Sequence, residues 1–195
     1  SAISSQLSIS NQSKPSVSTT PAIDLSGSIQ GNLLIESLAV AANAPTGYQT
    51  TFTEIAGADT GANAVAIVNT DISIIDLDST TLYSAVITIT NLQDGDAEAL
   101  SISGALPAGI ADAYNAANGT LTLTGTASKA DYETALKLVR YNNNSDNPNT
   151  TARTIAITVN DGEIDSNTAV TTIALISVNE APVITSGTTA SFAEN

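Results

Sequence analysis

The chain has 195 residues, with 19 Asp and Glu against five Lys and Arg, and it contains no His, Cys, Met or Trp. The absence of His and Cys excludes thiol nucleophiles, Ser–His pairs and the usual transition-metal sites, and the formal charge of −14 disfavours nucleic acid, whose binding depends on Lys and Arg. The remaining ligands are carboxylate, carbonyl and hydroxyl oxygens, which hard cations such as Ca²⁺ prefer.

The composition indicates a β-rich chain. Only 12% of the residues are charged, about half the share usual in soluble domains, whereas Thr, Ile and Val are abundant, as they are in strands. The longest apolar run, residues 33–42, contains Glu36 and is too short to span a bilayer. We therefore expect no membrane insertion.

Residues 1–42 are a Ser-rich N-terminal segment, with ten Ser among the first 28 residues. We interpret this segment as a linker or an incomplete β-unit. The short alternating stretch 6–10 can pair with another strand but cannot form a core alone, and residues 33–42 are suited to a closing strand. Pro45 then marks a break, because proline lacks the N–H that a strand ladder needs.

Short strand-like patterns follow from Tyr48 onward and are separated by turn signals such as Asn118-Gly119 and Asp161-Gly162. About seven such strands predict an all-β fold in which two sheets form a sandwich. The expected strand regions are 48–54, 64–75, 84–92, 99–103, 120–124, 152–159 and 168–178.

One segment, residues 128–139, has helical rather than strand periodicity. Ser128 and Asp131 have the spacing of a capping box, and apolar residues recur at the i, i+3, i+4 and i+7 positions that begin with Tyr132. We predict one short helix whose apolar face covers one end of the sandwich.

A short motif occurs at both ends of the chain. Asn43-Ala44-Pro45 precedes a strand pattern that ends in Phe-x-Glu at Glu54, and 179–182, Asn-Glu-Ala-Pro, precedes another that ends at Glu194. These copies predict a tandem repeat with a period of about 137 residues, although two unrelated proline breaks would also produce them. The expected organisation is the segment 1–42, a repeat at 43–180, and at 181–195 a linker with the first strand of a following repeat or a donor strand.

Several further motifs occur in a consistent order: Asp-Leu-Asp-Ser-Thr-Thr-Leu at 76–82, Leu-Thr-Leu-Thr-Gly-Thr-Ala at 121–127, Tyr-Glu-Thr-Ala-Leu at 132–136, and Val-Asn-Asp-Gly at 159–162. In this order they resemble the cadherin-like repeats of large bacterial surface proteins. The resemblance covers about residues 43–182. It implies a Greek-key, immunoglobulin-like β-sandwich, end-to-end stacking of repeats, and calcium at the junctions between them.

The resemblance also implies a set of calcium ligands. Glu54 matches the acid that ends the first strand, and Asp76 and Asp78 match an Asp-x-Asp motif. The full implied set is Glu54, Asp76, Asp78, Asp161, Asn179 and Glu194. The linker around Asn179 carries fewer acids than its animal counterparts, so the affinity should be weak, with Kd about 10⁻⁴–10⁻³ M.

The residues themselves allow two interpretations of these acids. Alternate residues of an extended segment face the same way, so Asp76 and Asp78 can converge on one ion. The alternative is that the aspartates form Asx turns, in which the side chain accepts a backbone hydrogen bond. We interpret the segment Asp94-Gly95-Asp96 as a hairpin turn rather than a calcium loop.

We therefore expect an extracellular structural or adhesion repeat, on a bacterial cell surface or secreted, and not an enzyme. With seven aromatic residues and no Trp, the chain lacks the stacking platforms of a sugar-cleaving cleft. The expected partners are neighbouring repeats or subunits. One alternative is a filament subunit whose strand at 183–194 completes a β-fold in the next molecule. Another is a module that binds a cell-surface glycan or protein receptor.

Overall fold

The computed structural model of the chain describes residues 8–10, 47–56, 61–182 and 184. No helix among them is long and apolar enough to cross a membrane. The elements are β1 (Ser8–Ser10), β2 (Tyr48–Thr53), β3 (Val65–Ala66), β4 (Ser73–Ile75), β5 (Thr81–Ile89), β6 (Glu98–Ile102), β7 (Ala111–Asn115), β8 (Thr120–Ser128), α1 (Lys129–Leu138), β9 (Val139–Asn143), β10 (Arg153–Asn160) and β11 (Ala169–Ile176).

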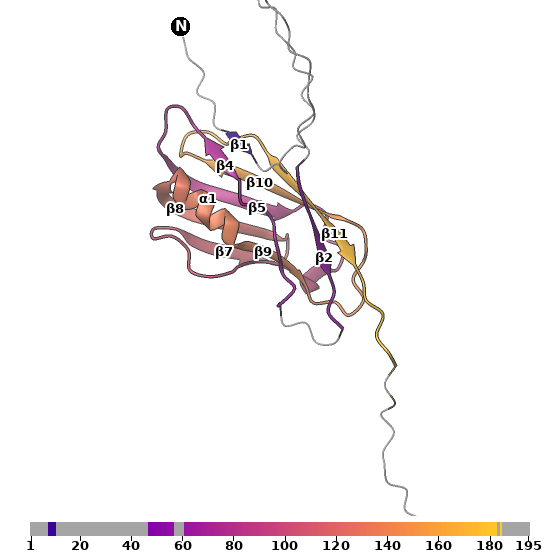
Figure 1. The fold of residues 1–195 in the computed structure, drawn as a ribbon. Coiled ribbons are helices and arrows are strands. Elements are labelled where there is room, and N and C mark those ends of the chain that lie inside the picture. Colours follow the sequence, from indigo (N-terminus) through magenta and orange to yellow (C-terminus); the bar gives the residue numbers. More distant parts are fainter. Residues whose placement is uncertain (1–7, 11–46, 57–60, 183, 185–195) are drawn as a thin grey trace, which may run out of the picture.

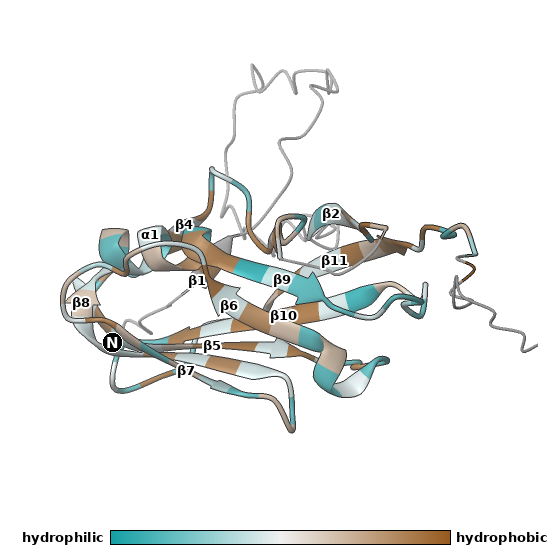
Figure 2. Cartoon of the chain, turned by 90° about the horizontal axis from the view of Figure 1, so that it is seen from below, coloured by the Kyte–Doolittle hydropathy of each residue, from teal (hydrophilic) through white to brown (hydrophobic). Residues whose placement is uncertain are grey.

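The strands form a sandwich-like, mainly β fold with one helix, as the sequence predicts. A six-stranded sheet has the order β2-β11-β10-β5-β8-β7, in which β2 is parallel to β11 and the other neighbours are antiparallel. A three-stranded sheet, β3-β9-β6, lies over it, and β1 pairs with β4 in a two-stranded sheet. In Figure 2, α1 and β4 lie on the same side of the large sheet as β9.

The core lies between the sheets and follows the alternation seen in the sequence. On β5, Ala85, Ile87 and Ile89 are almost completely buried, which confirms the face assigned to them from the pattern of apolar residues. The two sheets meet where Phe52 of β2 packs edge-to-face on Tyr141 of β9, with ring centroids 5.6 Å apart and an interplanar angle of 88°. Such a pair adds to the stabilisation that burial provides.

The helix α1 begins at the predicted capping box. The Asp131 N–H donates to Ser128 Oγ at 3.1 Å, and the Ser128 N–H donates to Asp131 Oδ2 at 3.3 Å. Tyr132, which is fully buried, donates its hydroxyl to the Gly125 carbonyl at 2.7 Å. On the other side, Glu133 Oε1 accepts the N–H of Ile74 at 2.8 Å, so the helix is fixed to both β8 and β4.

Three features differ from the sequence predictions. The strand β9 lies outside the expected strand regions and pairs with β6 and β3. The edge strand β7 was not predicted, because Ala, Asp and Asn have low strand propensity and its pairing with β8 is a property of the tertiary structure. The hairpin predicted at Asp94-Gly95-Asp96 is wrong. This segment is a 3₁₀ turn, Gly95–Ala97, that connects β5 in the large sheet to β6 in the small one.

Replacing Gly125 by Ala should destabilise the fold strongly. Gly125 has φ +130°, and a Cβ at this position would collide with the Gly109 carbonyl oxygen. We expect G125A to lower the free energy of unfolding by about 3–5 kcal/mol. Gly95 is the matched control, because its φ is +57° but its Cβ position is open, and G95A should lose only about 1–2 kcal/mol. Urea denaturation followed by circular dichroism measures both, and equal losses would contradict the close approach at Gly125.

Candidate functional site

An acidic cavity lies at the end of the sandwich that also carries β1 and β4 (Figure 1), which we call the N-terminal pole. The cavity has a volume of about 230 Å³ and is lined by Asp78, Ser79, Asp161 and Glu163. Its two walls are the turn 76–80, which precedes β5, and the loop 161–168, which follows β10. They lie side by side because β5 and β10 are antiparallel neighbours and Ser84 pairs with Asn160.

Asp76 begins the turn that forms one wall of this cavity, and it is buried, at 7% exposure. Its Oδ1 atom accepts the N–H groups of Asp78 at 3.2 Å and Ser79 at 3.1 Å, which is an Asx turn. Its Oδ2 atom is buried and accepts no hydrogen bond. Because an unpaired buried polar atom is unfavourable, this oxygen is suited to an additional ligand.

The surroundings of Asp76 favour its charged form. Burial acts to raise its pKa, but the hydrogen bonds from the Ser79 and Asp78 N–H groups and the charge of Lys129 hold the pKa below its ordinary value. Lys129, the first residue of α1, donates its ammonium to the carbonyl oxygens of Asp76 at 2.7 Å and Ser79 at 2.8 Å. The helix therefore holds the turn in place through the backbone.

Asp161 organises the opposite wall in the same way. Its Oδ1 atom accepts the N–H groups of Glu163 at 2.9 Å and Ile164 at 2.8 Å. In both Asp76 and Asp161, one carboxylate oxygen thus forms a turn, and the hydrogen bonds of these turns leave the second oxygen unused. The turn-forming and metal-binding interpretations of these residues are therefore compatible.

Glu54 lies at the opposite end, the C-terminal pole, where the chain leaves β11 (Figure 1). Strand β2 runs parallel to β11 from Tyr48, opposite Thr171, to Thr53, opposite Ile176. Counted along the strands at 3.3 Å per residue, these registers place Glu54 roughly 36 Å from the end of β10 that carries the acidic cavity. The six implied ligands are therefore not one cluster.

The environment of Glu54 resembles that of Asp76. Glu54 is buried at 5% exposure, its Oε2 atom accepts the Val178 N–H at 2.8 Å, and its Oε1 atom is buried and accepts no hydrogen bond. Asn179 follows Val178 but is exposed, and its amide donates to the Glu180 carbonyl at 3.3 Å. Glu194 lies outside the described residues. Within the described ranges, no three acidic side chains are placed to hold one ion by themselves.

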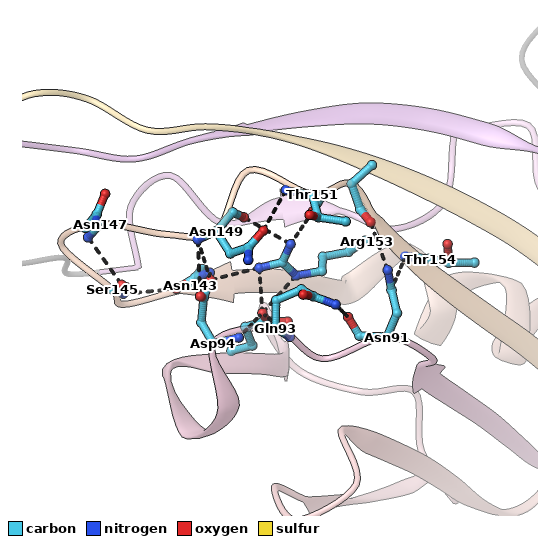
Figure 3. Close-up of polar contacts among 12 residues, drawn as sticks. Asn91, Gln93, Asp94, Asn143, Ser145, Asn147, Asn149, Thr151, Arg153 and Thr154 are labelled. Carbon is cyan, nitrogen blue, oxygen red and sulfur yellow. Dashed lines mark hydrogen bonds and ion pairs between the residues drawn. The ribbon is translucent and has the colours of Figure 1, made fainter.

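Figure 3 shows a buried ionic network that the sequence analysis missed. It lies toward the C-terminal pole, at the start of β10. The guanidinium of Arg153, fully buried at the start of β10, is 2.8 Å from Asp94 Oδ2 and 2.7 Å from Glu98 Oε1. Asn143 donates its amide to Asp94 Oδ2 at 2.7 Å, and the Asn149 N–H also reaches the Asp94 carboxylate. The network joins β6, β9 and β10.

Arg153 is charged and has its partners in place. Burial acts to lower its pKa, but the Glu98 hydrogen bond and the charges of Glu98 and Asp94 raise the pKa above its ordinary value. The sequence did contain a signal, because Arg153 is in phase with the inward residues Ile155 and Ile157 of an alternating strand. A cation at an inward position needs a buried anion, but the pattern does not identify which one.

Comparison with known proteins found no protein-family model, no curated protein and no solved structure that matches this chain.

Removing the Arg153 charge should destabilise the protein, because the buried Glu98 and the partly buried Asp94 would remain without their cation. We expect R153M to lower the free energy of unfolding by about 3–5 kcal/mol. Adding E98Q to R153M should recover part of this loss, since it removes a buried unpaired charge. K137A, which removes a cation from the surface of α1, is the control and should change stability by at most about 0.5 kcal/mol. Urea denaturation of the four proteins measures this, and an R153M loss no larger than that of K137A would contradict the network.

The lowered pKa of Asp76 predicts the direction in which the free energy of unfolding changes with pH. A carboxyl whose folded-state pKa lies below its unfolded value adds stability above the unfolded pKa and loses it as the pH falls through the folded pKa. We therefore expect the stability difference between the wild type and D76N to be largest near neutral pH and to shrink below about pH 4. The free energy of unfolding of both proteins between pH 7 and strongly acidic pH measures this. A constant difference would show that the charge of Asp76 is not stabilised.

Proposed function

We propose that this chain is an extracellular structural or adhesion repeat that binds Ca²⁺ at its N-terminal pole. The observation that carries the proposal is the acidic cavity together with the buried Asp76 Oδ2 atom that accepts no hydrogen bond. Hard oxygen ligands and the absence of His and Cys from the sequence favour calcium over transition metals.

Electrostatics supports a cation at this place. The side chains of Asp78, Asp161 and Glu163 line one small cavity, and like charges at such separations repel unless a cation lies between them. The charge of Lys129 lowers the pKa of Asp76. The Lys129 ammonium, however, donates to two backbone carbonyls rather than to a carboxylate. A divalent ion would relieve the repulsion.

The proposed coordination is incomplete within one repeat. Ca²⁺ takes 6–8 oxygens at 2.3–2.6 Å, and Asp76, Asp78 and Asp161 would supply some of them, with Glu163 as a ligand beyond those that the sequence implied. Water and an adjoining repeat would supply the rest. Glu54 and Asn179, at the C-terminal pole, would serve the following junction in the same way, and Glu194 would belong to the next repeat.

The same proposal includes the fold type. The chain crosses from the large sheet to the small one after β2, after β5 and after β8, and it returns to the large sheet after β6 and after β9. Crossings of this kind, with β2 parallel to the last strand β11, support a Greek-key, immunoglobulin-like or cadherin-like sandwich. Entry and exit at opposite poles would suit repeats stacked end to end on a cell surface.

Calcium should stabilise the protein through the acidic cavity. If Ca²⁺ binds only the folded state, the free energy of unfolding should rise by about 2.7 kcal/mol once free calcium is about 100 times Kd. D76A/D78A should abolish this rise. The matched control is D96A/D112A, which removes the same charge from two exposed positions and should keep the rise.

The calcium-dependent stabilisation is measured by thermal unfolding, first in chelator and then in a calcium titration. A magnesium titration provides the comparison with a second cation. A calcium-dependent shift that persists in D76A/D78A would place calcium elsewhere, and no shift in the wild type would overturn the proposal. A glycan array distinguishes the receptor-binding alternative, since specific hits that do not depend on calcium would favour it.

A further inference from the structure

The strand β1 comes from far outside the body of the fold. Residues 8–10 pair antiparallel with β4, with Ile9 opposite Ile74, and Ile9 is 4% exposed and belongs to the hydrophobic core. Residues 11–47 separate it from β2 in the sequence. One remote side chain therefore completes the core at the N-terminal pole, beside β4 (Figure 1).

The backbone of Ile9 is held by a side chain on the side that faces away from β4. The N–H of Ile74 donates to Glu133 of α1 at 2.8 Å, away from β1, so Ile9 and Ile74 form a non-hydrogen-bonded pair of the ladder. The N–H and C=O of Ile9 consequently point away from β4. There the Asn167 side chain accepts the Ile9 N–H through Oδ1 at 2.9 Å and donates through Nδ2 to the Ile9 carbonyl at 3.2 Å.

The Asn167 amide thus occupies the place of a neighbouring peptide group. Its position is fixed by the adjacent Ser166, which accepts the Val159 N–H through Oγ at 3.0 Å and donates its own N–H to the Val159 carbonyl at 2.8 Å. We call the groove between β4 and Asn167 the Ile9 socket. The socket forms hydrogen bonds with the backbone of Ile9 and buries the Ile9 side chain. Sheets bind an added strand through the same two kinds of contact.

The contacts in the socket do not require that the strand belongs to the same molecule. The connection from Ser10 to Tyr48 spans 37 residues, 11–47, and its fully extended length is about 120–130 Å, several times the length of the sandwich. A connection of this length gives an effective concentration on the order of millimolar or less, while the described contacts bury a single side chain. Exchange between copies preserves every contact, and this is the condition for strand swapping.

We propose that the Ile9 socket is a strand-acceptor site that takes residues 8–10 from a second copy of this chain. Reciprocal exchange gives a dimer, and exchange in one direction gives an open chain of subunits. The donor is the N-terminal strand, whereas the filament alternative drawn from the sequence used the C-terminal strand at 183–194. The proposal does not depend on the proposed calcium site, and its test is made in chelator so that the two fail separately.

The chain has no cysteine, so engineered disulfides can report the exchange. Ser10 is opposite Ser73 in the ladder, and directly opposed strand residues lie within the Cα range of a disulfide. Two single variants of the full chain, S10C and S73C, are mixed at a protein concentration on the order of 1 mM and oxidised gently. Peptide mass spectrometry then counts disulfides that join position 10 of one chain to position 73 of another.

We expect this cross-chain disulfide at least about tenfold more often than in a matched mixture of S10C and S101C, because only the ladder holds the two cysteines together. Ser101 is exposed on β6 and does not face β1. Adding I9S to the S10C chain should reduce the cross-link to the level of this control, since the socket would lose its buried side chain.

The double variant S10C/S73C, oxidised at low concentration, shows whether the strand is seated at all. A disulfide within one chain, together with no cross-chain product in the mixture, would show that β1 stays in its own molecule and would overturn the proposal. Failure of both reactions would overturn the socket itself. A cross-link that survives I9S would assign the association to another surface.

Discussion

The antiparallel pairing of β5 with β10 at the centre of the large sheet is the constraint on which the rest of the structure depends. Its ladder runs from Ser84 opposite Asn160 to Ile89 opposite Ile155, and it fixes which loops meet at each end. At the N-terminal pole it brings the turn before β5 beside the loop after β10. At the C-terminal pole it brings Asn91 beside the start of β10, where the Asn91 amide donates to the Ala152 carbonyl at 2.9 Å. Every polar assembly described above lies at one end of this ladder.

The scarcity of positive charge gives these two ends different character. Within the described ranges, the ion pairs are those of Arg153 with Asp94 and Glu98, so the C-terminal network contains its own cation. At the N-terminal pole the ammonium of Lys129 is directed at backbone carbonyls, and the cavity beside it is lined by carboxylates. The Arg153 network thus has a cation within the protein, whereas the acidic cavity at the N-terminal pole is suited to an external one. The same loop that carries Asp161 also carries Asn167, so the acidic cavity and the Ile9 socket share a wall.

Local patterns predicted the elements whose signal is contained in a few neighbouring residues. The alternation in β5 identified its buried face, and the spacing of Ser128 and Asp131 located the start of α1, because pleat and helix caps are short-range geometry. The patterns did not predict elements whose structure depends on residues distant in the sequence. The residues of β7 have low strand propensity and become a strand by pairing with β8, and the turn at Asp94 connects two sheets, which no adjacent residue encodes. The burial of Arg153 is visible as strand phase, but its anions are more than 50 positions away.

The sequence by itself determined the chemistry available to this protein: oxygen ligands, a large excess of carboxylates, strands with one apolar face and a single capped helix. These follow from residue types and short spacings. Only the tertiary structure decided where that chemistry lies, because strand register assigns residues to a pole from distant parts of the chain. It separated Glu54 from Asp76, Asp78 and Asp161, placed Glu163 with the last two of these, and directed Arg153 inward. It also assigned a place in the core to Ile9, whose short Ser-Ile-Ser strand has no fixed partner until β4 and Asn167 stand on either side of it.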